Sequence, residues 1–172
     1  MMIPHLANER GMSTIEIVTI LVISGILFAT AVSRLKDNPA KVMRRNAARV
    51  VLRDFRYAQE MAITHGKAVR IEIQLDQNRY LIKWARTNEL LPKPNGDGPF
   101  IRQFGSNEFL YVSLTGSELE TNNFVFGTSG KPFVAGQELQ VPKTVLTLNA
   151  THHLIVLPYT GKIKLQSDDT GE

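Results

Sequence analysis

Gly11-Met12-Ser13-Thr14-Ile15-Glu16 opens the apolar part of this 172-residue chain, and no charged residue follows Glu16 until Arg34. A helix needs about 20 consecutive apolar residues to cross a hydrocarbon core roughly 30 Å thick. The segment 12–33 has that length if Glu16 can be accommodated. The sequence therefore predicts one membrane-spanning helix over residues 12–33, with the rest of the chain attached to it.

Glu16 is the unusual residue of this segment. Because a carboxylate in the apolar part of a membrane is costly, it usually has a partner or a function. One interpretation places Glu16 at the headgroup level, where water solvates it. The other starts from the residues in front of it, which are a polar leader (residues 1–10), then Gly11, with Glu16 at the fifth position after that glycine.

This arrangement resembles the prepilin signal of type IV pilins and type II secretion pseudopilins. The resemblance implies that a prepilin peptidase cleaves between Gly11 and Met12 and methylates the new amine of Met12. It also implies that Glu16 neutralises an N-terminal amine during filament assembly and that Gly25 is the glycine that loosens this helix. Ser33 stands where many major pilins have Pro, which favours a pseudopilin or minor pilin.

The composition limits the chemistry available to the rest of the chain. The sequence contains no Cys, which excludes a disulfide framework and thiolate ligands or nucleophiles. The formal net charge is +4 and the sequence pI is about 9.5, a moderate basic excess. No set of acid, base and nucleophile is visible, so we expect no enzyme activity, no cofactor and no small-molecule substrate.

The basic residues bear on membrane orientation. Arg10 is the one basic side chain close before the apolar segment, whereas several follow it: Arg34, Lys36, Lys41, Arg44 and Arg45. The positive-inside rule alone would place the C-terminal part in the cytoplasm, as in a membrane-anchored cytoplasmic regulator. The prepilin resemblance is the more specific observation, and it implies a periplasmic C-terminal part.

An amphipathic helix is predicted after the apolar segment. Asn38 is suited to cap it, Pro39 to occupy its first position and Gly66 to end it. Apolar residues recur in between at spacings of three and four, which is typical of one helical face. They are Met43, Ala47, Val50, Val51, Phe55, Ala58, Met61 and Ala62. We therefore expect residues 34–66 to continue the N-terminal helix, kinked or re-initiated at Pro39, with one face on a sheet.

The opposite face of this helix carries Arg45, Arg49, Arg53 and Arg56. Four guanidinium groups on one face could follow the phosphates of DNA without reading bases. The alternative, which we favour, is a face that is solvated or that pairs with carboxylates of neighbouring subunits in a filament. By its angle on the helix, Asp54 points towards the apolar side, and we expect it to pair with a polar group at the sheet edge.

From residue 69 onward the pattern becomes strand-like. Residues 69–75 alternate apolar and polar, Asp76-Gln77-Asn78 is typical of a turn, and residues 79–84 return as the second strand of a hairpin. Residues 86–99 are rich in Pro and Gly and predict a loop. Further strands are expected at 109–114, 124–126, 144–148, 153–157 and 162–166. A helix followed by antiparallel strands predicts an α+β domain whose sheet packs on the helix.

Several motifs resemble the GspH/FimT family of minor pseudopilins and minor pilins. They are residues 52–62 and 65–69, then Phe126-Gly127, Gly130-Lys131-Pro132 and Thr160-Gly161-Lys162. The resemblance implies a pilin-like fold, with a long transmembrane and amphipathic helix packed on an antiparallel β-sheet head. It divides the chain into a cleaved leader (1–11), a transmembrane helix (12–33), an amphipathic continuation (34–66) and a β-rich periplasmic head (67–172).

Two other motifs are candidates for a metal site and a phosphate-binding loop, and neither has the required residues or spacing. His152 and His153 are predicted to lie at a surface turn with diverging side chains, and no suitably spaced carboxylate completes a metal site. Residues 127–131 (Gly-Thr-Ser-Gly-Lys) lack the spacing of a phosphate-binding loop, so we expect a β-turn there. No metal site is predicted.

These inferences describe a minor structural subunit of a type II secretion pseudopilus or a type IV pilus. Such a subunit is expected to cross the bacterial inner membrane once, with its C-terminal head in the periplasm, and to assemble into a periplasmic or extracellular filament through its N-terminal helix. Its expected partners are other pilin or pseudopilin subunits, the prepilin peptidase and the inner membrane. A DNA-binding minor pilin for DNA uptake and a membrane-anchored cytoplasmic regulator are the alternatives.

Overall fold

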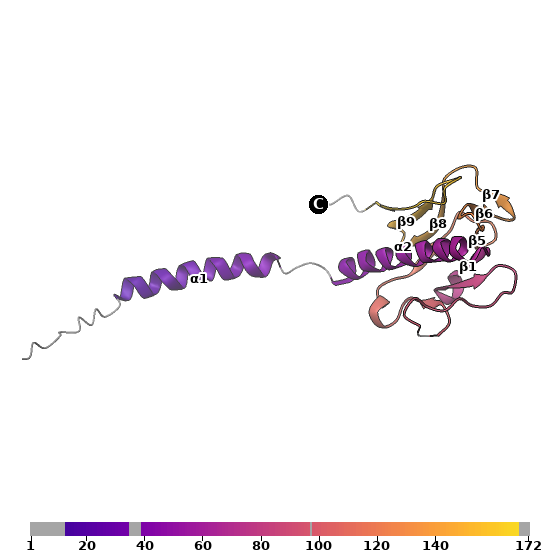
Figure 1. Ribbon diagram of the computed structural model, residues 1–172. Coiled ribbons are helices and arrows are strands. Elements are labelled where there is room, and N and C mark those ends of the chain that lie inside the picture. The colour runs from indigo at the N-terminus through magenta and orange to yellow at the C-terminus, as the bar shows by residue number, and fades with distance from the viewer. Residues whose placement is uncertain (1–12, 35–38, 97, 169–172) are drawn as a thin grey trace, which may run out of the picture. The chain divides into compact units, whose positions relative to one another are not determined.

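A computed structural model describes residues 13–34, 39–96 and 98–168 of the chain (Figure 1). The chain separates into two compact units, one containing α1 and the other containing α2 and the strands. We describe each unit by itself.

The first unit contains α1 (Thr14–Arg34). Its first turn is closed by Ser13, whose carbonyl accepts hydrogen bonds from the amides of Glu16 at 2.9 Å and Ile17 at 3.2 Å. No proline or glycine lies in the helix apart from Gly25, so nothing in its sequence interrupts the backbone hydrogen bonds. The predicted apolar helix is therefore present over residues 14–34.

The second helix, α2 (Pro39–His65), begins and ends where its sequence predicts. Pro39 occupies the first position, where the missing amide hydrogen costs nothing. Gly66 has a φ of 59°, and the amides of Gly66 and Lys67 donate to the carbonyls of Ile63 and Ala62 at 3.3 and 3.2 Å. These two bonds form a Schellman motif, which satisfies carbonyls at the helix end. The predicted cap, Asn38, lies outside the described residues.

The first sheet contains six antiparallel strands in the order β3-β2-β1-β5-β6-β7. The strands are β1 (Val69–Gln74), β2 (Arg79–Trp84), β3 (Ile101–Gln103), β5 (Asn123–Phe126), β6 (Pro132–Val134) and β7 (Gln137–Glu138). The predicted β1–β2 hairpin is confirmed, with Ile71 opposite Ile82. A 3₁₀ turn, η1 (Leu75–Gln77), and Asn78 with a φ of 49° connect its strands.

The second sheet contains four antiparallel strands in the order β10-β9-β8-β4. The strands are β4 (Leu114–Gly116), β8 (Lys143–Leu148), β9 (His152–Val156) and β10 (Ile163–Ser167). The predicted head had one sheet, so the division into two is a correction. The predicted strand at 109–114 is also wrong, because a 3₁₀ turn, η2 (Asn107–Phe109), and a further turn occupy most of it. Phe109 and Val112 are both buried there, three residues apart, whereas a strand would point them to opposite faces.

The apolar face of α2 forms the centre of the core. α2 contacts β1 and β5 of the first sheet and β9 and β10 of the second, and Figure 1 shows β1 and β9 on either side of it. Val51, Phe55 and Ala58 of α2 are fully buried. The α+β class is confirmed, but the helix packs against two sheets where one was predicted.

Candidate functional site

α1 is the one described helix that is long and apolar enough to cross a membrane. None of the window Thr14–Ala31 is buried, and Phe28 is 72% exposed. Two of its hydroxyl groups bond within the helix, because Thr19 Oγ1 donates to the carbonyl of Ile15 at 2.7 Å and Thr30 Oγ1 to that of Leu27 at 2.8 Å. Polar groups satisfied in this way suit a surrounding that offers no water.

Two of the predicted processing and assembly residues, Glu16 and Gly25, lie on α1. Gly11 and Met12 lie outside the described residues. Glu16 lies in the first turn of α1 and is exposed. A carboxylate there stabilises the helix itself, because it faces the positive end of the helix dipole. A Cβ atom added at Gly25 would meet no heavy atom within 4 Å, so the helix offers a flat surface there.

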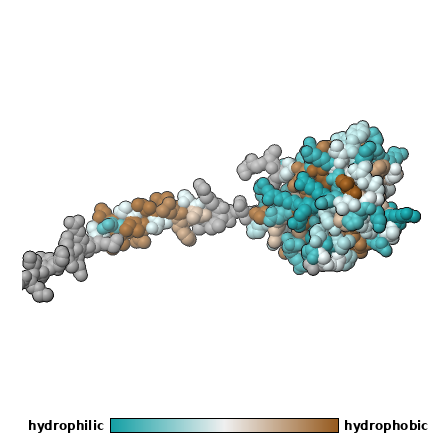
Figure 2. Space-filling view, in the orientation of Figure 1, coloured by the Kyte–Doolittle hydropathy of each residue, from teal (hydrophilic) through white to brown (hydrophobic). Residues whose placement is uncertain are grey.

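The basic face of α2, defined by Arg45, Arg49, Arg53 and Arg56, is exposed along its length. None of the four side chains forms an ion pair within the part of the chain that the structure describes. Figure 2 shows hydrophilic side chains gathered over the N-terminal half of α2. The arginines are thus free to meet anions from outside the head.

The distribution of charged residues in the first half of α2 is unfavourable for the helix dipole. The first turn has no acidic residue, and the first acidic residue of the whole helix is Asp54. A cation in the first turn, here Lys41, costs about 0.3–1 kcal/mol at low ionic strength. The charged residues of this part of α2 therefore do not stabilise the helix itself.

Asp54 is the charged residue that α2 buries, at 2% exposed. Its Oδ2 accepts hydrogen bonds from the Tyr80 hydroxyl at 2.6 Å and from Arg102 Nε at 2.8 Å, and Arg102 Nη2 lies 2.8 Å away. Arg102 lies on β3, an edge strand of the first sheet, so the prediction that Asp54 pairs at the sheet edge is confirmed. The Arg102 guanidinium lies 5.8 Å from the ring centres of both Phe100 and Phe109, which holds it in place.

Burial dominates the electrostatics of this cluster. It raises the pKa of Asp54 above the ordinary value of a carboxyl, although the hydrogen bonds from Tyr80 and Arg102 oppose the rise. Burial, followed by the charge of Asp54, raises the pKa of Tyr80 well above that of an ordinary tyrosine. The cluster ties α2 to the edge strand, and Tyr80 is too deeply buried to act as an acid or base towards a substrate.

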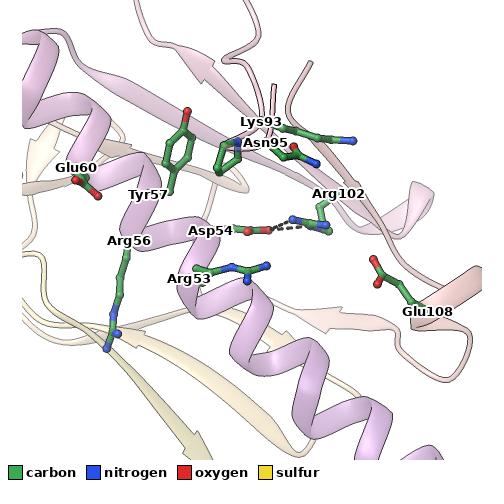
Figure 3. A pocket seen from close by; sticks show the side chains of 10 residues that line it. Arg53, Asp54, Arg56, Tyr57, Glu60, Lys93, Asn95, Arg102 and Glu108 are labelled. Carbon is green, nitrogen blue, oxygen red and sulfur yellow. Dashed lines mark hydrogen bonds and ion pairs between the residues drawn. The ribbon is translucent and has the colours of Figure 1, made fainter. Parts of the chain in front are cut away.

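A groove of about 650 Å³ lies beside the Asp54 cluster. In Figure 3, Arg53 extends next to Asp54 towards Arg102, Glu108 faces them across the groove, and Arg56 points away. The other lining residues are Tyr57, Glu60, Lys93, Pro94 and Asn95. The lining side chains carry charges of both signs. The groove therefore offers basic, acidic and polar groups to a molecule that enters it.

Gln59 joins segments that lie far apart in the sequence. Its Nε2 donates to the carbonyls of Gly130 and Thr160, both at 2.9 Å, and so joins α2 to a turn of each sheet. Gly161 packs so closely there that an added Cβ would lie 2.6 Å from the same nitrogen and closer still to the Gly130 carbonyl. The three segments thus share a structural role, because they meet at Gln59.

The predicted turn at residues 127–131 is confirmed, because the amide of Gly130 donates to the carbonyl of Gly127 at 2.9 Å and that of Gly127 to the carbonyl of Lys131 at 2.8 Å. The predicted surface turn at His152 and His153 is wrong, whereas the predicted divergence of their side chains is confirmed. Both lie on β9, where strand alternation buries His152 and leaves His153 2.9 Å from Asp168. Within residues 13–34, 39–96 and 98–168, no group of three or more His, Asp or Glu is placed to hold a metal ion.

No protein-family model and no curated protein matches the chain. Among solved structures, the chain is similar to the minor pseudopilin EpsH from the type 2 secretion system of Vibrio cholerae, with 15% sequence identity and a TM-score of 0.47. The match covers 72% of this chain and 95% of that chain. The functional inference below rests on the residues of this chain.

Proposed function

We propose that the chain is a minor structural subunit of a type II secretion pseudopilus or a type IV pilus, of the GspH/FimT kind. The observation that carries the proposal is α1, which has no charge between Glu16 and Arg34 and buries none of its membrane-length window. Gly11 precedes Glu16 at the spacing of a prepilin signal. An apolar helix whose membrane-length window is unburied suits lipid or other apolar helices, and a filament subunit meets both in turn.

In this proposal the leader 1–11 is removed and Met12 becomes the methylated N-terminus. Helix 12–33 then anchors the subunit in the inner membrane, with the head (67–172) in the periplasm. During assembly Glu16 pairs with an N-terminal amine in the bundle of helices. At about 4 Å such a pair attracts by roughly 4 kcal/mol at an effective dielectric constant near 20, enough to set the register of docking.

The first experiment is the N-terminal mass of the protein from membranes of cells with and without an active prepilin peptidase. We expect a chain that begins at methylated Met12 in the first strain and an uncleaved chain in the second. An intact leader in both strains would overturn the proposal. The membrane-anchored cytoplasmic regulator would then be favoured, and a topology reporter fused after Glu172 would test it.

The second experiment separates processing from assembly. In Glu16→Ala and Glu16→Gln we expect normal cleavage but little incorporation into filaments, because the carboxylate is lost. Glu16→Asp, which keeps the charge, is the matched control and should retain part of the incorporation. Cross-linking to neighbouring subunits measures it, and normal incorporation of Glu16→Gln would refute the role given to the carboxylate.

One observation supports DNA binding as a second candidate function, namely the four exposed arginines of the basic face, which form no ion pair with any described residue. Phosphate contacts of this kind predict affinity that falls steeply with salt and does not depend on sequence. Fluorescence anisotropy of duplex DNA with the detergent-solubilised chain tests this candidate. Arg45→Gln/Arg49→Gln/Arg53→Gln/Arg56→Gln should abolish the binding if it exists, and unchanged binding would exclude the basic face as its site.

A further inference from the structure

We propose that the first half of α2 binds anionic phospholipid headgroups at the surface of the membrane that holds α1. The contact surface, here called the headgroup patch, consists of Lys41, Arg45 and Arg49. The proposal rests on the membrane anchoring in the proposed function, and it does not depend on filament assembly or on which side the head lies.

Chain length keeps the headgroup patch near the membrane. α1 ends at Arg34 and α2 begins at Pro39, so five peptide units connect the helices and span at most roughly 18 Å. Lys41 lies about 3 Å further along the axis of α2 and Arg49 about 15 Å. The patch therefore starts within about two Debye lengths of the lipid headgroups, whatever angle the two units adopt.

The patch has the chemistry of a surface for anions. Its three side chains recur four residues apart, which places them in one row along α2, and all three are exposed. No acidic residue occurs from Pro39 to Arg53. Val42, beside the row, is 46% exposed and offers apolar contact to an interface that is partly hydrocarbon.

The same observations favour lipid over nucleic acid for this half of the helix. A short stretch of chain joins Lys41 to the membrane helix, whereas nothing in the chain holds DNA near it. A phosphate backbone would have to follow the whole basic face, but Arg53 and Arg56 border a groove that also contains Glu60 and Glu108. The purely basic part of α2 is the part that follows the apolar helix most closely in the sequence.

The test uses the full chain in vesicles. Because the sequence has no Cys, a single Val42→Cys accepts a fluorophore, and Thr64→Cys, exposed near the far end of α2, provides the reference position about 33 Å away. Vesicles of phosphatidylcholine, with or without phosphatidylglycerol, carry a quencher on their headgroups. A basic residue near an anionic surface strengthens binding by about fivefold. At Val42→Cys we expect several-fold stronger quenching in vesicles with phosphatidylglycerol than in vesicles without it, and high salt should remove this difference. At Thr64→Cys the quenching should differ little between the two kinds of vesicle.

Two variants of equal charge change make the test specific. Lys41→Gln/Arg45→Gln/Arg49→Gln should abolish the extra quenching, while Arg53→Gln/Arg56→Gln/Arg86→Gln should keep it, with equal melting temperatures as the folding control. Equal quenching in both vesicles, or equal loss in both variants, would overturn the proposal. Loss of duplex DNA binding together with intact lipid-dependent quenching in Lys41→Gln/Arg45→Gln/Arg49→Gln would overturn the proposal and reassign the patch to nucleic acid. Failure to float with either vesicle would overturn the membrane anchor as well, whereas failed assembly in cells would not affect this result.

Discussion

The two helices differ in where their partners are. α1 is apolar on all sides and exposes its membrane-length window completely, whereas α2 buries one apolar face between two sheets and exposes a basic one. Every fully buried residue of α2, such as Val51, has its neighbours in the same chain. The difference teaches that the packing of α2 is explained by the head, whereas the partners of α1 and of the basic face are known only as proposals.

The largest expected effect is on the buried face of α2. Phe55 is completely buried and meets Tyr80 edge to face at 5.6 Å. Phe55→Ala should lower the free energy of unfolding of the head by about 3–5 kcal/mol, because it leaves a cavity. Urea unfolding followed by tryptophan fluorescence measures it. Membrane retention by α1 should not change, and Val42→Ala, on the exposed side of the same helix, should cost far less.

The corresponding change in α1 should have the opposite pattern. Ile23→Arg places a charge near the middle of the apolar helix, at a cost of roughly 2.5–3.5 kcal/mol in membrane insertion. We expect a loss of the membrane-bound fraction after carbonate extraction and an unchanged melting temperature of the head. Thr64→Arg adds the same charge to an exposed position of α2 and should leave both measurements unchanged. A head destabilised by Ile23→Arg would show that α1 has a partner in its own chain.

Asp54 tests the one charged contact that α2 makes in the core. Asp54→Ala leaves Arg102 without its carboxylate and should cost about 2–3 kcal/mol, below the value for a fully buried pair because Arg102 is 18% exposed. Asp54→Ala/Arg102→Met should recover part of this loss, because no unpaired charge remains. If the double variant is no more stable than Asp54→Ala, the pair contributes through packing alone.

Gln59 tests the link between α2 and the two sheets. Gln59→Leu removes the donor to two carbonyls, and we expect the free energy of unfolding to fall by about 1–2 kcal/mol. Glu60→Gln, one position along and exposed, is the control and should change it by less than about 0.5 kcal/mol. Thermal denaturation of both variants compares them. An equal loss in the two variants would remove Gln59 from its proposed role.

The smallest effect concerns Glu72, whose partner Lys83 Nζ lies 2.6 Å away in the same sheet. The hydrogen bond from Lys83 lowers the pKa of Glu72. The ionised pair therefore stabilises the folded head at pH values above the ordinary carboxyl pKa, and this stabilisation is lost as the pH falls through the lowered pKa. Glu72→Gln should cost less than about 1 kcal/mol at neutral pH and nothing in strong acid. Urea unfolding across this pH range checks the sign.

Local patterns predicted the elements that depend on neighbouring residues. Alternation predicted the hairpin of β1 and β2, and Pro39 and Gly66 predicted both ends of α2. The pattern failed at residues 109–114, because the same apolar residues can alternate along a strand or lie three apart in a turn. It also failed at His152, where the strand begins one residue earlier than predicted and buries the ring.

The sequence also predicted some features of the candidate sites and not others. The spacing of Gly11 and Glu16, the apolar length of α1 and the row of arginines are readable from the sequence, and their proposed roles are still predictions. The angle of Asp54 on the helix predicted a polar partner at a sheet edge, but it could not name Arg102, which lies 48 residues further along.

The sequence by itself determined an apolar helix, an amphipathic helix with a basic face, and a β-rich remainder, because these depend on periodicity over a few turns or strands. Only the tertiary structure decided that the remainder forms two sheets, that a groove lies beside Arg53, and that Gln59 joins turns 71 and 101 residues away. The physical reason is that a hydrogen bond or a packed ring depends on distance in space, and no local pattern of residues encodes which distant segments meet.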